Sequence, residues 1–165
     1  MALRVVAMSF LVFLLSLTSF TSLATAERCD YHIQVKTGDV DHAGTDSRIN
    51  LKLISSSGET LDIYNLIFWG GSKGHDHFER GQLDHFKARD TCVQPCAITV
   101  RSNGKGLASG WYLEYVDVAV TGHGINFEEE FDVNTWLDNV GPYKLQVTVN
   151  KCSGSSISKP TLSSV

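Results

Sequence analysis

Residues 31–36 read YHIQVK, in which Tyr, Ile and Val alternate with His, Gln and Lys. Because successive side chains of a β-strand point to opposite faces, this period of two predicts a strand with one buried face. The same alternation recurs at 48–53 (RINLKL) and at 143–150 (YKLQVTVN). Five more candidate strands lie at 61–68, 78–88, 97–101, 111–120 and 124–131. Gly-rich and Ser-rich turn segments separate them, so we predict an all-β sandwich or barrel of about eight antiparallel strands.

Two local expectations follow from the same patterns. Within the strand at 111–120, Trp111, Leu113 and Tyr115 are expected to share one face, since they are two residues apart. Asp84 and Glu114 are expected on the solvated faces of their strands. One helical turn is predicted, at 134–139.

The two ends of the chain differ in composition from the middle. Residues 1–26 carry a single charge, Arg4, then an apolar run and a small-x-small ending at Ala26, which is typical of a secretory signal peptide. A mature domain is then expected at 27–152 and a flexible Ser-rich tail at 153–165. Residues 27–165 contain no apolar run long enough for a transmembrane segment. The predicted location is therefore extracellular or apoplastic, with the endoplasmic reticulum as the alternative.

Charge and motifs exclude some functions. The net charge of −4 argues against nucleic acid as a partner. The motifs of nucleotide-binding loops, nucleophile elbows and zinc proteases are missing from the sequence, which favours a non-enzymatic binding protein.

Four cysteines, Cys29, Cys92, Cys96 and Cys152, follow the predicted cleavage point. In an oxidising compartment they indicate two disulfides, for which three pairings exist. Cys29 and Cys152 stand at the outer ends of the first and last strands, and Gln94-Pro95 supplies a turn between the other two. We expect the pairs Cys29–Cys152 and Cys92–Cys96.

Histidines and tryptophans offer the alternative functions. On an extended chain, His75, His77 and Glu79 would share one side, as in a strand-borne metal site, so a metal-dependent enzyme using His75 and His77 is one alternative. The other interpretation of this segment is a polar loop of solvated histidines. Trp69 precedes two glycines and is the tryptophan expected to be exposed, which makes a carbohydrate-binding module the second alternative. Trp111 and Trp136 are expected in the core.

Calcium is the cofactor to consider. Gly44, Asp46 and Asn103 lie on loops between predicted strands and offer the hard oxygen ligands that calcium prefers. The competing interpretation is hydrogen bonding of Asx side chains within turns.

Several segments resemble, in order and spacing, the PLAT (lipoxygenase homology) domain. They are Thr37-Gly38, AGTDS at 43–47, the strand ending at Leu53, FERGQLDHF at 78–86 and GWYLEYV at 110–116. Together they extend the similarity over about residues 29–152. A single such domain behind a signal peptide resembles the small secreted plant PLAT-plant-stress and embryo-specific protein group.

The resemblance implies a sandwich of two four-stranded antiparallel sheets without catalytic activity. It implies binding to a membrane lipid surface or a protein partner through loops at one end, with calcium as a possible cofactor, in plant stress responses or in seed and embryo development. No catalytic domain is expected beside it in so short a chain. Gly110 stands where the family usually has an acidic residue, and Asn103 is the candidate replacement. The candidate surface-binding residues are Val40, His42 and Trp69. The resemblance also implies that Phe78 packs inward and that Glu79 is structural.

Overall fold

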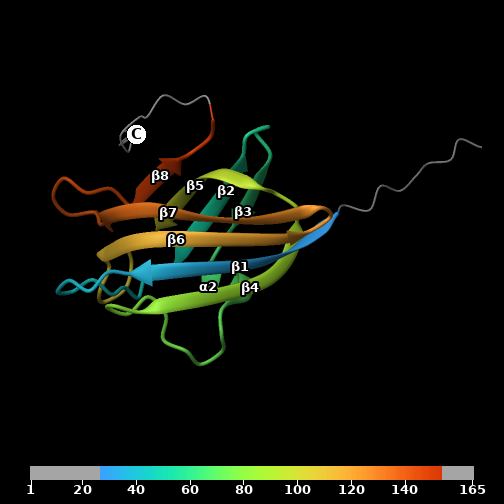
Figure 1. Cartoon of the computed structure of the whole chain (residues 1–165). Helices are drawn as coiled ribbons and strands as arrows, with labels where there is room; N and C mark the ends of the chain where they lie inside the picture. The colour runs from blue at the N-terminus through green and yellow to red at the C-terminus, as the bar shows by residue number, and fades with distance from the viewer. Residues whose placement is uncertain (1–26, 154–165) are drawn as a thin grey trace, which may run out of the picture.

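The computed structural model describes residues 27–153 as two four-stranded antiparallel sheets packed face to face (Figure 1). The elements are β1 (Arg28–Thr37), β2 (Ile49–Ser55), β3 (Thr60–Ile63), α2 (Leu66–Gly70), β4 (Leu83–Thr91), β5 (Pro95–Ser102), β6 (Trp111–Gly122), β7 (Ile125–Leu137) and β8 (Gln146–Asn150). Sheet A has the order β4-β1-β6-β7, and sheet B has the order β3-β2-β5-β8. The predicted sandwich is confirmed. The expected signal peptide and residues 154–165 of the expected tail lie outside the described residues.

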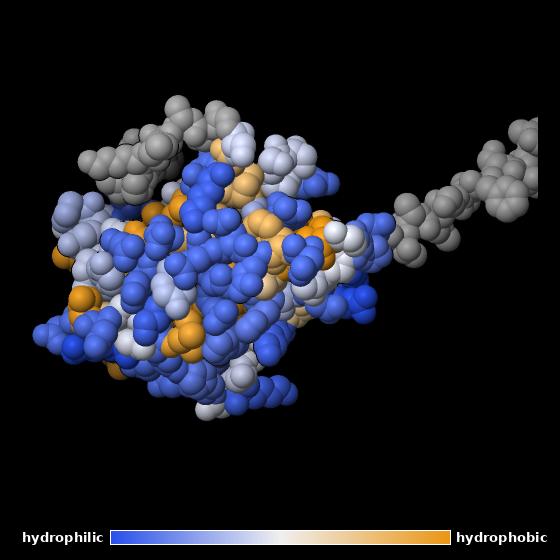
Figure 2. Space-filling view, viewed as in Figure 1, coloured by the Kyte–Doolittle hydropathy of each residue, from blue (hydrophilic) through white to orange (hydrophobic). Residues whose placement is uncertain are grey.

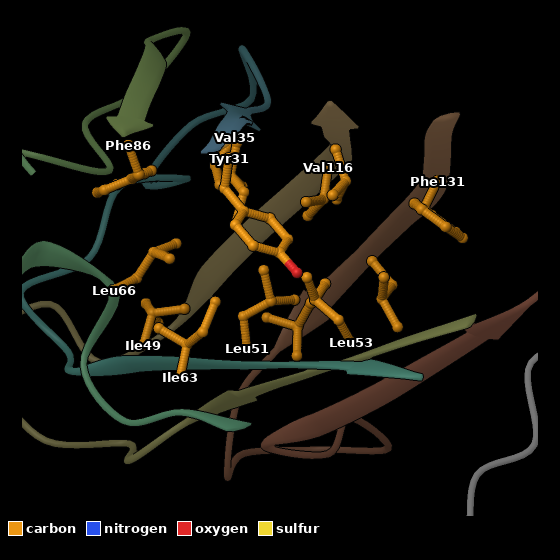
Figure 3. Packing of buried hydrophobic residues seen from close by; sticks show 14 of the residues in the cluster. Tyr31, Val35, Ile49, Leu51, Leu53, Ile63, Leu66, Phe86, Val116 and Phe131 are labelled. Carbon is orange, nitrogen blue, oxygen red and sulfur yellow. The ribbon is translucent and has the colours of Figure 1, made fainter. Parts of the chain in front are cut away.

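Alternating side chains of both sheets fill the space between them. Figure 3 shows Val116 and Phe131 of sheet A above Leu51 and Leu53 of sheet B, with the Tyr31 ring between the layers. Each large apolar side chain buried in this way contributes about 1.5–3 kcal/mol. Trp111 is fully buried, as expected, and its indole Nε1 donates to Thr37 Oγ1 at 3.0 Å. The predicted alternation therefore builds one continuous core.

The outer face of sheet A is mostly hydrophilic, with scattered apolar residues (Figure 2). Asp117 of β6 lies on this face beside acidic residues of β7, and only 9% of it is exposed. Desolvation by burial, followed by the charge of Glu128, raises the pKa of Asp117. Gln34 Nε2 donates to Asp117 Oδ1 at 3.3 Å and partly offsets this effect.

A β-bulge changes the expected face of Tyr115. The register of β6 against β1 shifts there, because Thr37 pairs with Leu113 but Lys36 pairs with Tyr115, so β6 carries one extra residue. An extra residue in one strand moves every later side chain to the opposite face. Trp111 and Leu113 point into the core as predicted, but Val116 takes the next inward position. The prediction that Tyr115 shares their face was wrong.

Three further predictions of element bounds were also wrong. The strand expected at 78–88 begins only at Leu83, because residues 78–82 form a loop in which Phe78 and Gly81 have positive φ. The strand expected at 61–68 ends at Ile63, because Asn65 has a φ of 76° and its Oδ1 accepts from Phe68 N at 3.4 Å. This is N-cap chemistry, and it starts α2 instead of continuing a strand. The helical turn expected at 134–139 is absent from the described residues, since β7 continues to Leu137 and pairs there with Trp111.

The disulfides join neighbouring strands of the same sheet, so the expected pairing was wrong. Cys29 of β1 bonds Cys92, just after β4, and Cys96 of β5 bonds Cys152, just after β8. The Cα atoms are 4.9 and 4.7 Å apart. A Cys29–Cys152 bond would instead have to connect two sheets, because β1 and β8 belong to different layers. Both disulfides lie at the end of the sandwich where β1 begins.

We predict that the double variant Cys96→Ser/Cys152→Ser keeps the Cys29–Cys92 bond and shows no free thiol in denaturant. It loses one long-range crosslink, which contributes about 4 kcal/mol in the chain-entropy model for loops of this length. Thiol titration and thermal unfolding measure the two effects. The mismatched variant Cys29→Ser/Cys152→Ser is expected to expose two thiols, and none in that variant would contradict the observed pairing.

We also predict that Asp117→Asn unfolds at a higher temperature than the wild type at pH 7. The raised pKa means that the folded state binds a proton more tightly than the unfolded chain. The stability of the wild type therefore falls as pH rises from the ordinary pKa of 3.8 to the raised pKa of the folded state. The asparagine keeps the acceptor for Gln34 but carries no charge. Thermal melts at several pH values should show the difference vanishing below the ordinary pKa of 3.8. A difference independent of pH would contradict this cause.

Candidate functional site

Three loops meet at the end of the sandwich opposite the disulfides. They are the β1–β2 loop (38–48), the β5–β6 loop (103–110) and the β7–β8 loop (138–145). Figure 1 shows the first and the third of them together at the left end of the sheets. We call this region the loop end.

Thr45 ties the first two loops together. Its hydroxyl donates to Ala108 O at 2.8 Å, and the neighbouring Asp46 N donates to the same carbonyl at 3.1 Å. Ser47 Oγ adds a bond to Lys105 O at 2.8 Å. The AGTDS segment therefore holds the β1–β2 loop against the β5–β6 loop by hydrogen bonds.

Two of the three predicted calcium ligands, Asp46 and Asn103, lie where these two loops meet, but their side chains differ in how many hydrogen bonds they accept. Asp46 Oδ2 accepts only a long bond from Ala108 N, at 3.4 Å, so the carboxylate keeps free lone pairs. Asn103 Oδ1 already accepts from Lys105 N at 3.2 Å, which is the turn chemistry of the competing interpretation, and from Arg48 N of the β1–β2 loop at 3.0 Å. Gly44 packs against the backbone of Glu79 and Arg80 instead. Calcium binding stays a prediction.

Asp138 is an acidic residue of the loop end that the sequence analysis missed. A Cβ built on Gly110 would lie 2.9 Å from Asp138 Oδ2, so this carboxylate stands directly beside the position where the resemblance implied an acidic residue. Its Oδ1 accepts from Asn139 N at 2.7 Å. The sequence around Gly110 could not have indicated Asp138, because Asp138 follows β7 and comes next to Gly110 only through the β6–β7 pairing.

Apolar side chains project from the tips of the same loops. Leu107 is fully exposed, Val140 is 68% exposed, and Val40 and Tyr143 are each 40% exposed. A cleft of about 570 Å³ opens between the loops, lined by Asp41, His42, Leu107, Ala108, Gly110, Trp136, Asp138 and Tyr143. Of the predicted surface residues, Val40 and His42 thus belong to the loop end.

Trp136 and Trp69 differ from their expected environments. Trp136 is half-buried rather than in the core, and its ring contacts Tyr112 and Tyr143 beside the cleft. Trp69 of α2 is also half-buried: its Nε1 donates to Asp90 Oδ2 at 2.9 Å, and its ring packs against Tyr31. Trp69 does not present the free stacking face that a sugar platform needs.

The loop between α2 and β4 (71–82) supports the loop end from the side. Phe78 is buried, as the resemblance implied, and Phe78 O accepts from Thr45 N at 3.1 Å. Arg80 donates to Asp39 Oδ1 at 2.7 Å and to Asp41 Oδ1 at 2.5 Å. The hydrogen bond with Asp39 raises the pKa of the exposed Arg80.

The predicted histidine cluster forms with a different carboxylate. His75 and His77 lie together with Asp84 of β4, within 4.8 Å measured between ligand atoms, and Glu79 is not part of the group. Asp84 is 1% exposed, so the expectation that it is solvated was wrong. It occupies an inward position of β4, in phase with the buried Phe86.

Comparison with known proteins agrees with this architecture. A family model described as the PLAT/LH2 domain matches residues 31–150. PLAT domain-containing protein 1 of Arabidopsis thaliana is 36% identical over 151 residues, covering 86% of this chain and 83% of its own length.

Two solved lipoxygenase structures are similar to this fold. Coral 8R-lipoxygenase, described as activated by calcium via a C2-like domain, matches with a TM-score of 0.56 and 20% identity. That match covers 73% of this chain and 16% of the lipoxygenase. A calcium-dependent 11R-lipoxygenase matches with a TM-score of 0.50 and 27% identity, covering 74% and 17% respectively. This chain therefore spans a small part of those enzymes. Among residues 27–153, no helix is both long and apolar enough to cross a membrane.

Proposed function

The chain belongs to the PLAT/LH2 domain family, and from this premise we propose that it is a secreted, non-enzymatic protein that binds lipid surfaces through its loop end with the help of calcium. The family model and the Arabidopsis relative support a binding domain rather than a catalytic one. They favour neither the carbohydrate-binding alternative nor the metal-dependent enzyme.

The observation that carries the proposal is the set of exposed apolar tips around an acidic cleft. Leu107 and Val140 stand on different loops, and neither is covered by another described residue to any large extent. Burying a leucine or valine side chain in an apolar phase contributes about 1.5–3 kcal/mol, so two tips inserted together give useful affinity for a membrane interface. Trp136 and Tyr143 line the cleft below them, and such amphipathic rings suit the headgroup region.

Charge explains why calcium is needed. Asp41, Asp46 and Asp138 lie at the loop end of a protein whose net charge is −4, so anionic lipid headgroups would be repelled. A divalent cation bound at Asp46 would reduce this negative charge and attract the headgroups. Asp46 fits this role because its oxygens are hard ligands with free lone pairs. Asn103 fits only if its Oδ1 gives up the hydrogen bonds from Lys105 N and Arg48 N, so Asp46 is the ligand we assign first.

Disulfides support the proposed location. All four cysteines are paired, and such bonds persist in oxidising compartments. We therefore propose export to the extracellular space or apoplast, with the endoplasmic reticulum as the alternative. A role in plant stress or in seed and embryo development is the physiological setting that we propose.

We predict that calcium raises the unfolding temperature of the full chain and that Asp46→Ala abolishes this rise. A ligand selective for the folded state stabilises it, by about 2.7 kcal/mol at a hundredfold excess over its Kd. Differential scanning calorimetry with calcium and with chelator measures the effect. Asp62→Ala, which removes an exposed carboxylate from sheet B, is the control and should keep the rise. The calcium role is wrong if the wild type shows no shift.

We predict that the protein binds phosphatidylcholine–phosphatidylserine vesicles in calcium and that Leu107→Ser/Val140→Ser weakens binding by at least about tenfold. Cosedimentation with and without chelator measures this. The control is Phe68→Ser, which removes a side chain 88% exposed on α2, away from the loop end. Equal binding by the double variant contradicts the proposal. An absence of vesicle binding by the wild type contradicts it too and redirects the search to a protein partner.

A further inference from the structure

The group of His75, His77 and Asp84 lies under the 71–82 loop, beside the first residues of β4. The three ligand atoms lie within 4.8 Å of one another. His77 and Asp84 are buried, whereas the side chain of His75 is 44% exposed. Two imidazoles and a carboxylate therefore converge on one point that solvent reaches from the His75 side.

Asp84 is positioned by both of its oxygens. Oδ2 accepts from Phe78 N at 2.7 Å, and Oδ1 lies 2.9 Å from His75 Nε2. Phe78 has a φ of 66°, which is unusual for a phenylalanine, and the Asp84 bond helps to hold this turn. Oδ2 thus accepts from the backbone, while Oδ1 contacts His75.

His77 carries an unsatisfied nitrogen. The residue is 5% exposed, and its Nε2 has no hydrogen-bond partner among the described residues. The ring is fixed by stacking on Phe86, with centroids 5.4 Å apart, and by an edge contact with His75 at 4.6 Å. A buried polar atom without a partner costs about 1–3 kcal/mol, so a site that retains one needs an explanation.

Asp84 is a carboxylate buried away from water, which is also energetically costly. The side chain is 0% exposed, and the ion pair recorded for it is with the partly exposed His75. A buried carboxylate needs a cation or a full set of hydrogen bonds to be stable. One bound cation would satisfy both the carboxylate and the orphan imidazole nitrogen.

We propose that His75, His77 and Asp84 form a binding site for a divalent transition metal, with zinc as the preferred ion. Imidazole nitrogen and carboxylate oxygen are ligands of zinc, whereas calcium takes six to eight oxygens. Tetrahedral ligands about 2.0–2.2 Å from zinc lie roughly 3.4 Å apart. His75 Nε2 and Asp84 Oδ1, now 2.9 Å apart, would separate slightly, and the other ligand atoms already lie within 4.8 Å. Gln82 Nε2 lies 2.5 Å from His75 Nε2 at the exposed side of the group and would move aside on metal binding, which leaves the fourth position for water.

The site has a structural consequence for the loop end. Zinc on Asp84 Oδ1 leaves the Oδ2 bond to Phe78 in place, and it ties the 71–82 loop to β4. The same loop carries Arg80, which holds Asp39 and Asp41, and Phe78, which holds Thr45. The metal therefore stiffens the support of the β1–β2 loop.

The experiment uses the full chain, produced without a polyhistidine tag, stripped with chelator and titrated with zinc chloride. Calorimetric titration is expected to show one zinc per chain, and the unfolding temperature should rise with zinc but not with magnesium. His77→Phe keeps a ring against Phe86 but removes the ligand, so zinc should bind at least about tenfold more weakly. Without metal, His77→Phe should be at least as stable as the wild type, because it also removes the orphan nitrogen.

Two further variants sharpen the test. Asp84→Asn keeps an acceptor for Phe78 N and loses the charge, so its zinc affinity should fall as well. His85→Gln is the matched control: it breaks the surface pair in which His85 Nδ1 lies 3.0 Å from His32 Nε2, and it should bind zinc like the wild type. No saturable zinc binding by the wild type, equal affinity in His77→Phe, or loss of binding in His85→Gln would each overturn the proposal. His77→Phe decides the matter if Asp84→Asn does not fold.

Discussion

The loop end depends on one buried hydrogen bond, from Phe78 N to Asp84 Oδ2. It fixes the turn that places the Phe78 ring in the core and leaves Phe78 O free to accept from Thr45 N. Thr45 in turn donates its hydroxyl to Ala108 O. A continuous path of hydrogen bonds thus runs from β4 through the 71–82 loop and the β1–β2 loop to the β5–β6 loop. Because Asp84 is shielded from water, this path starts from a point where such bonds are strongest.

The two ends of the sandwich differ in how they are held together: one by disulfides, the other by hydrogen bonds and ion pairs. Both disulfides lie where β1 begins and join neighbouring strands, so they restrict the unfolded chain without touching the opposite loops. The loop end has no covalent link and is held by hydrogen bonds and by the exposed pairs of Arg80 with Asp39 and Asp41. Exposed ion pairs contribute little stability. Loops held in this way can adjust to a surface while the core and the disulfides keep the fold.

Period-two alternation was enough to predict an all-β sandwich or barrel, because strands with one buried face are the main information in this sequence. The resemblance to the PLAT domain implied the two four-stranded sheets. It failed where geometry depends on partners far along the chain. The bulge before Tyr115 arises in the pairing of β6 with β1, and Asn65 starts a helix through a positive φ that alternation does not encode. The disulfide pairs follow strand order within sheets, which the spacing of cysteines does not contain. Asp84 was predictable in principle: it is two residues from Phe86 and therefore shares its inward face.

The two proposed metal sites are separated by ligand chemistry. Asp46 offers oxygen ligands in exposed loops, which suit a labile calcium ion, whereas the histidine site offers two nitrogens under a loop, which suit zinc. Both sites connect to Phe78, whose N–H is bonded to Asp84 and whose carbonyl is bonded to Thr45, next to Asp46. Zinc at Asp84 Oδ1 would leave both bonds intact, so it would hold the calcium loop in place rather than compete with it. A preorganised loop loses less conformational entropy when it binds, and the buried site would therefore strengthen the exposed one.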